Sequence, residues 1–245
     1  MENKENEREE RKGNGIFLGI VGVATLIVAI IGASFAYFSI QASSDPGAVN
    51  VTAYQFSASL SMSEVYGPGE DGIIPVDPDG TVTGATAPDN TNLAYAINVE
   101  SGTKTRSCTD GNGYGICALY EVTVSNDSNS QLVLDGVIKT VSNEAGSGGE
   151  AFSNLQYRLA TINSGYYTIG ATGTALGTTA GDEVSIGQIT VPAKSGENPG
   201  TYTTYILIYL NELKAENEDT HVMEAQDQSV EMGASYSGQI IFTSN

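Results

Sequence analysis

The chain has no tryptophan, one histidine, two cysteines and only ten lysines and arginines among its 245 residues. A zinc peptidase of the H-E-x-x-H type needs two histidines on one helical turn, and His221 stands alone. A Ser-His-Asp hydrolase is not indicated either, because the segment EDTHVMEA around His221 contains no nucleophile elbow. We therefore expect a protein that is not an enzyme and has no cofactor, with His221 in a solvated loop.

Basic residues are scarce throughout, and 29 acidic residues give a formal net charge of -19. Such a surface repels phosphate backbones and anionic lipid, so nucleic acid is excluded as a partner. The acidic residues suit a soluble extracellular face that attracts cations, or they only keep the protein in solution.

Residues 16–38 form a long apolar run without a charged side chain. At 1.5 Å per residue a helix over this run spans about 35 Å, enough to cross the hydrocarbon of a bilayer. Arg11 and Lys12 precede it and few basic residues follow, so the N-terminal side should stay in the cytoplasm. The sequence thus predicts a cytoplasmic stub (1–15), a signal or transmembrane helix (16–38) and an extracellular domain (45–245).

The end of the apolar run is compatible with two outcomes, retention of the helix as a membrane anchor or its removal by a signal peptidase. A secretory signal usually has an apolar core of 7 to 15 residues, so this longer run favours a retained membrane anchor. Ser34 and Ala36, however, occupy the -3 and -1 positions of a possible signal peptidase cut, which Tyr37 and Phe38 follow. These two aromatic residues also suit the interface of a permanent anchor. A type IV pilin is disfavoured, because no acidic residue lies between Gly13 and Gln41.

Beyond residue 45, apolar and polar residues alternate with the period of half-buried strands. The segment 201–212, TYTTYILIYLNE, is apolar on both faces from Tyr205 to Leu210, which predicts a central strand that is covered on both sides. Turn signals such as DPDG, DGNGYG and EAGSGGE separate the strands. The pattern predicts an all-β fold, an antiparallel β-sandwich of jelly-roll or immunoglobulin-like topology, after one N-terminal membrane-inserting helix. Only residues 213–232 suggest a helical turn or a long loop. The predicted strands are built on Tyr54, Phe56, Ala58, Leu60 and Met62; on Tyr120, Val122 and Val124; on Leu155, Tyr157 and Leu159; on Val184 and Ile186; and on Tyr236, Ile240 and Phe242.

Two cysteines, Cys108 and Cys117, flank the glycine-rich stretch TDGNGYGI. Outside the cell such a pair is expected to be oxidised, which would clamp the loop before the strand ALYEVTVSN. A loop this short contributes roughly 2.5 kcal/mol in the chain-entropy description of disulfides. A redox or metal role is disfavoured, because the spacing is not C-x-x-C and no histidine is near in the sequence.

Two short stretches offer oxygen atoms to a calcium ion. Asp77 and Asp79 stand on either side of Pro78, and Asp110 precedes Asn112 by two residues. Calcium requires six to eight oxygen ligands, and neither stretch continues as a complete loop motif. Ordinary Asp-Gly turns are the alternative reading, and it is the one we favour.

The glycine-bearing apolar run ends in ASFAYFS, and the chain closes with GASYSGQIIFTSN. The first stretch resembles the signal segment of the TasA and camelysin family of Gram-positive bacteria, and the second is similar to the last strand of many such proteins. Ile40 stands where the family pattern has Asp or Thr. The resemblance implies removal of the helix by a dedicated signal peptidase and self-assembly of the mature chain into biofilm matrix fibres.

The expected function follows from the predicted fold and this resemblance. A segment freed after Ala36 can add as a strand to an open sheet edge of the next subunit. The stretch GAVNVTAYQFSASL (47–60) is a plausible donor or first strand. The alternative is an uncleaved single-pass ectodomain, an adhesin-like protein whose loops bind carbohydrate or a partner protein.

Overall fold

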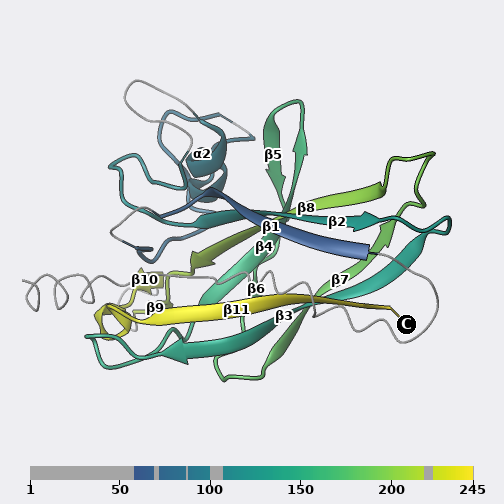
Figure 1. Cartoon of the computed structure of the whole chain (residues 1–245). Coiled ribbons are helices and arrows are strands. Elements are labelled where there is room, and N and C mark those ends of the chain that lie inside the picture. The colour runs from purple at the N-terminus through teal and green to yellow at the C-terminus, as the bar shows by residue number, and fades with distance from the viewer. Residues whose placement is uncertain (1–57, 69–71, 87, 100–106, 218–222, 245) are drawn as a thin grey trace, which may run out of the picture. The chain divides into compact units, whose positions relative to one another are not determined.

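The computed structural model describes residues 58–68, 72–86, 88–99, 107–217 and 223–244 (Figure 1). The predicted membrane helix, the possible cut after Ala36, and His221 lie outside these residues. Within the described ranges, no helix has both the length and the apolar character needed to cross a membrane.

The described residues are mostly β-strand, with one short α-helix among them. The main strands are β1 (Ala58–Tyr66), β2 (Ala118–Asn126), β3 (Leu132–Glu144), β4 (Leu155–Asn163), β5 (Tyr166–Ile169), β6 (Thr174–Ala175), β7 (Glu183–Val191), β8 (Gly200–Leu210) and β11 (Ser235–Ser244). The helix is α2 (Asn92–Asn98), and a small hairpin of β9 (Lys214–Glu216) and β10 (Met223–Ala225) and the 3-10 turn η1 (Ser229–Glu231) precede β11.

Two antiparallel sheets form the body of the domain. The larger sheet has the order β1-β2-β8-β4-β5, with β6 also paired to β4. The smaller sheet has the order β11-β3-β7. The described strands pair antiparallel throughout, which confirms the predicted all-β, antiparallel class.

The main core lies between the two sheets and makes the fold sandwich-like. One apolar cluster joins the inward-facing residues of both sheets, so alternating positions of each strand are buried while their neighbours face outward. Among its members are Tyr120, Val122 and Val124 of β2, Leu155 and Tyr157 of β4, Ile186 of β7, and Tyr236 and Phe242 of β11. The alternation read from the sequence therefore identified the core-facing side of these strands correctly.

The outer face of the larger sheet carries a second apolar cluster. Leu93, Ala96 and Ile97 of α2 pack with Tyr205, Leu207 and Tyr209 of β8 and with both cysteines. β8 is therefore central in its sheet and covered on both faces from Tyr205 onward, as predicted. Tyr205, Leu207 and Tyr209 are at most 6% exposed.

The helix α2 was not predicted from the sequence. Thr91 caps it, because its hydroxyl accepts a hydrogen bond from the Ala94 N–H at 3.4 Å. The apolar spacing of Leu93, Ala96 and Ile97 is helical, but the helix has only seven residues and its signal is correspondingly weak. The predicted helical turn in 213–232 is present as η1, although the same segment also forms the β9–β10 hairpin.

Candidate assembly site at the open side of the sandwich

One side of the sandwich is bounded by two edge strands, β1 of the larger sheet and β11 of the smaller one. Among the described residues, β1 pairs only with β2, and β11 pairs only with β3. In Figure 1 both edge strands lie toward the viewer, β1 in blue above β11 in yellow. An edge strand presents a row of unpaired backbone N–H and C=O groups, which can accept another strand.

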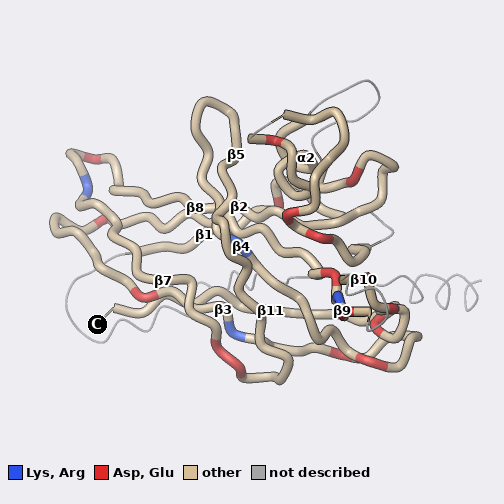
Figure 2. The backbone as a smooth tube through the Cα atoms, turned by 180° about the vertical axis from the view of Figure 1, so that it is seen from behind, with Lys and Arg blue, Asp and Glu red and all other residues tan. Residues whose placement is uncertain are grey.

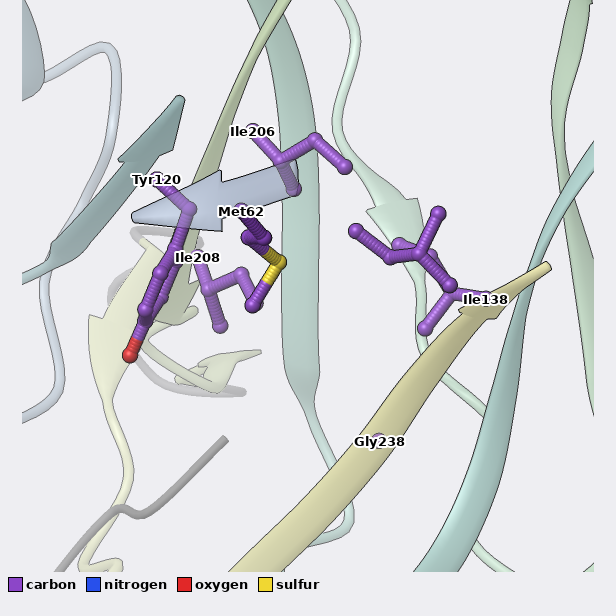
Figure 3. A pocket seen from close by; sticks show the side chains of 7 residues that line it. Met62, Tyr120, Ile138, Ile206, Ile208 and Gly238 are labelled. Atoms are coloured by element: carbon purple, nitrogen blue, oxygen red, sulfur yellow. The ribbon is translucent and has the colours of Figure 1, made fainter. Parts of the chain in front are cut away.

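A small apolar groove lies between these two edges, and most of its lining side chains belong to the buried main core. Its lining comes from both sheets: Met62 of β1, Tyr120 of β2, Ile138 of β3, Ile206 and Ile208 of β8, and Gly238 and Ile240 of β11. Figure 3 shows Met62 and Ile138 on opposite sides of this space, with Gly238 on β11 below. A Cβ at Gly238 would lie 3.0 Å from the Tyr236 ring, so the glycine allows this ring to pack against β11.

The edge strand β11 lacks the usual protection against strand pairing. Its sequence, SYSGQIIFTS, has no charged residue and no proline, two of the features by which natural edge strands discourage further pairing. A bulge lies between Ser237 and Gly238, and the register is regular from Gly238 to Ser244. In a chain with a net charge of -19, an uncharged ten-residue edge is an unusual surface.

Among the residues that line the groove, only Tyr120 has a polar side-chain group, and this phenol stays protonated. Burial raises the pKa of Tyr120 above its ordinary value, and the nearby Glu64 carboxylate adds to the rise. The groove is therefore lined by neutral side chains at every physiological pH.

Part of the predicted donor segment belongs to the sandwich itself. Ala58 and Leu60, the end of the stretch 47–60, lie in β1, where they pair with Asn126 and Val124 of β2 and pack on the main core. The first-strand alternative therefore holds for the end of the stretch, and only residues before Ala58 are available as a donor. Tyr54 and Phe56 lie outside the described residues.

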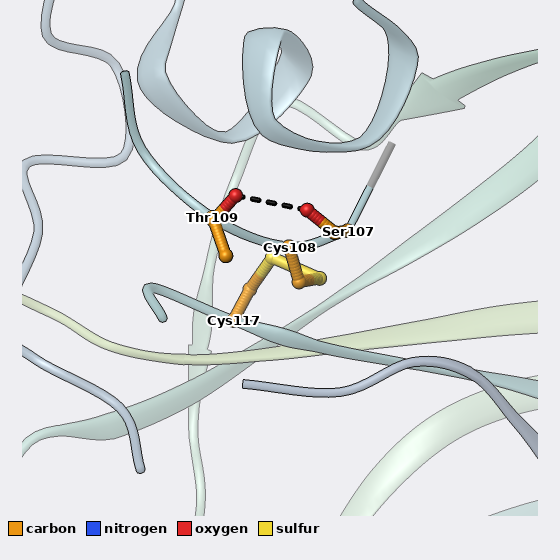
Figure 4. Close-up of a disulfide and its surroundings, with 4 residues drawn as sticks. All are labelled: Ser107, Cys108, Thr109 and Cys117. Atoms are coloured by element: carbon orange, nitrogen blue, oxygen red, sulfur yellow. Dashed lines mark hydrogen bonds between the residues drawn. A yellow bond between two sulfur atoms is a disulfide. The ribbon is translucent and has the colours of Figure 1, made fainter. Parts of the chain in front are cut away.

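The predicted disulfide is present between Cys108 and Cys117, with a Cα–Cα distance of 5.0 Å (Figure 4). Both cysteines are fully buried in the second apolar cluster, between α2 and the larger sheet. A backbone hydrogen bond from Ile116 N–H to the Cys108 carbonyl, at 2.9 Å, closes the same loop. The disulfide thus fastens the segment that covers the outer face to the start of β2.

Asp77 and Asp79, the first pair of calcium candidates, each hold a basic side chain. The Arg158 guanidinium donates to both carboxylate oxygens of Asp79, at 2.9 and 2.8 Å, and Lys214 donates to Asp77. Arg158 is only 7% exposed and also donates to the Tyr209 hydroxyl at 3.2 Å. The two ion pairs fasten the loop after Val76 to β4 and β9. Sequence reasoning missed this role, because nothing local in the sequence connects positions 79 and 158.

Asp110 and Asn112, the second pair of candidates, form a turn. The Asp110 carboxylate accepts hydrogen bonds from the backbone N–H groups of Asn112 at 2.8 Å and Tyr114 at 2.9 Å. This is an Asx-turn, in which the aspartate side chain accepts a hydrogen bond from the backbone N–H two residues later. Within the described ranges, no three His, Cys, Asp or Glu side chains gather as metal ligands. Figure 2 shows the acidic residues distributed mainly over loops and turns.

The Asp79–Arg158 pair predicts a pH-dependent contribution to stability. The hydrogen bonds from Arg158 hold the pKa of Asp79 below its ordinary value of 3.8. Because the pKa of Asp79 is lower in the folded than in the unfolded protein, its charge stabilises the fold at pH values above the unfolded pKa. This stabilisation is lost as the pH falls through the folded pKa. We expect Asp79→Asn to lower the free energy of unfolding by about 1 kcal/mol at pH 7, a modest value because the Asp79 side chain is 63% exposed.

Urea denaturation of the wild type and Asp79→Asn between pH 7 and pH 2.5 measures this difference. The difference should shrink as pH falls below about 4. Asp127→Asn, in the exposed loop after β2, is the matched control and should change stability little at any pH. A difference that stays constant down to pH 2.5 would show that the Asp79 charge is not responsible.

No family model matches the chain, and no curated protein is similar to it. Its function is therefore inferred from its own residues and their geometry.

Proposed function

We propose that this protein is a non-enzymatic structural subunit of extracellular filaments, exported by its N-terminal helix and assembled by strand addition. The observation that supports the proposal best is the uncharged edge of β11 beside the small apolar groove between the two sheets. The resemblance of ASFAYFS and GASYSGQIIFTSN to the TasA and camelysin family points to the same role in a biofilm matrix. In this proposal the two sheets form a sandwich of jelly-roll or immunoglobulin-like topology.

The chemical basis of assembly is the pairing of one subunit's N-terminal segment with the next subunit's edge. A signal peptidase cuts after Ala36, and the freed segment before Ala58 lies along β11. Its backbone pairs with the N–H and C=O groups of that edge, while alternate side chains such as Val49 and Val51 face the groove. Residues Gly238 to Ser244 offer seven positions of regular strand for this pairing.

Deletion of residues 39–52 tests the proposal. We expect the shortened protein to be secreted and folded but to form no filaments, because the donor is gone while β1 and the acceptor edge remain. Electron microscopy of the secreted protein gives the result, with circular dichroism as the check of folding. Filaments of unchanged appearance and number from the shortened protein would rule out strand addition by this segment.

An uncleaved single-pass ectodomain is the second candidate, favoured by the length of the apolar run at 16–38. It would display the same domain on the cell surface and bind carbohydrate or a partner protein through its loops. N-terminal sequencing of the protein from culture separates the two candidates. A mature start at Tyr37 or Phe38 supports the filament subunit, and an intact Met1 supports the anchored ectodomain.

A further inference from the structure

The outer face of the larger sheet is divided into an apolar half and a hydroxyl-bearing half. The register of β1, β2 and β8 places their outward residues in rows across the sheet. Two successive rows consist only of serine and threonine: Ser59, Ser125 and Thr201 in the first, and Ser61, Thr123 and Thr203 in the second. We call these six residues the hydroxyl floor.

The hydroxyl floor ends where the covered half begins. The next row is Ser63, Glu121 and Tyr205, and Tyr205 already belongs to the cluster beneath α2. The six floor residues are exposed or half-buried, in contrast to Leu207 and Tyr209 further along β8. The segment that carries α2 therefore covers one half of this face and leaves the other half to solvent.

Two of the floor hydroxyls bond each other, and two side chains in the neighbouring row do the same. The Thr123 and Thr203 hydroxyls lie 3.0 Å apart and share a hydrogen bond across two strands. In the row beside them, the Tyr205 hydroxyl donates to the Glu121 carboxylate at 2.8 Å. Burial, with a contribution from Glu121, raises the pKa of Tyr205 to about 12, so this phenol remains a donor at neutral pH.

The β4–β5 hairpin adds an aromatic residue on the side of the floor. Tyr167 points toward α2, because its ring lies 5.1 Å from that of Tyr205 and its backbone bonds the buried Asn98. Side chains alternate along a strand, so Tyr166, which is 46% exposed, points to the opposite face of the hairpin. Figures 1 and 2 both show α2 on one side of this hairpin and the far ends of β8 and β2 on the other.

We propose that the hydroxyl floor binds a neutral polysaccharide. Each floor hydroxyl both donates and accepts hydrogen bonds, as sugar hydroxyls do. Strands about 4.8 Å apart and outward residues about 6.8 Å apart along each strand give a flat, regular array that suits an extended polymer. Tyr166 adds an amphipathic aromatic face for a sugar ring.

Charge selects this ligand over other polymers. The six floor residues carry no charge, whereas the whole chain carries -19, so an anionic polymer is repelled by the surroundings and a neutral one is not. The floor lies on the outer face of the larger sheet and the groove lies between the sheets, so binding here is independent of the proposed filament contact.

Co-sedimentation of the full-length protein with microcrystalline cellulose, chitin and insoluble starch tests the proposal, with alginate beads as the anionic comparison. We expect binding to at least one neutral polymer and weaker binding to alginate. The double variant T123V/T203V removes two hydroxyls while keeping the branched side-chain shape, and it should bind about tenfold more weakly. T190V/T243V, which removes two exposed hydroxyls from the smaller sheet, is the matched control and should bind like the wild type.

Each other outcome would overturn the proposal. Absence of binding to all three neutral polymers would do so, as would equal binding by T123V/T203V and the wild type. Stronger binding to alginate than to the neutral polymers would contradict the charge argument. If T123V/T203V reduces sedimentation of the protein without any polysaccharide, the floor contacts another copy of the chain instead.

Discussion

Replacement of Ile240 by lysine is expected to prevent filament growth while the subunit remains folded. Ile240 lines the apolar groove from the edge strand β11 and is only partly buried. In the free subunit a lysine there can extend its ammonium group out of the open groove into water. In the filament the donor strand would cover the groove and leave the charge buried without a partner, which costs several kcal/mol. We therefore expect affinity for the next subunit to fall at least about a hundredfold.

The filament content of Ile240→Lys is measured by electron microscopy and by sedimentation, and its folding by thermal unfolding. Val133→Lys is the matched control, because Val133 lies on the outer face of the same sheet, is 40% exposed, and belongs to the interior strand β3. The control should form filaments. If folded Ile240→Lys forms them as readily as the wild type, the groove is not the site of assembly.

Replacement of Leu207 by alanine should have the largest effect on stability. Leu207 is fully buried on the central strand β8 and packs against the cover formed by α2 and the disulfide loop. Truncation removes the transfer free energy of the side chain and leaves a cavity, so we expect a loss of about 2–5 kcal/mol in the free energy of unfolding. Urea denaturation measures this loss.

Thr203→Ala is the control for Leu207→Ala. Thr203 lies on the same strand and the same face, four residues earlier, in the part that the cover leaves exposed. Its replacement should change stability by no more than about 0.5 kcal/mol. If both variants lost a similar amount of unfolding free energy, the boundary between the covered and open halves of the outer sheet face would be misplaced.

The strands could be predicted because their signal is local. Val122 and Val124, for example, alternate with polar residues, and burial of one sheet face imposes that period. The burial of both faces of β8 could also be predicted, because an uninterrupted apolar run from Tyr205 to Leu210 needs apolar contacts on both sides. The disulfide followed from the proximity of the only two cysteines in the chain.

The candidate site could not be predicted in the same way, because it depends on strand order. Met62 and Gly238 are 176 positions apart in the chain, and only the pairing of β1 and β11 with different sheets brings them to one groove. The ion pair between Asp79 and Arg158 has the same origin. The helix α2 was not predicted for another reason. A helix of seven residues is not stable alone, and α2 depends on its packing against β8.

Covalent trapping of the donor on the edge strand tests the central claim most directly. One preparation carries a single added cysteine at a position from 47 to 57, and a second carries Gln239→Cys on β11. After mixing and mild oxidation, we expect at least one donor position to give disulfide-linked dimers, and only when both preparations are present. Abundant filaments without a cross-link at any of these positions would contradict the account.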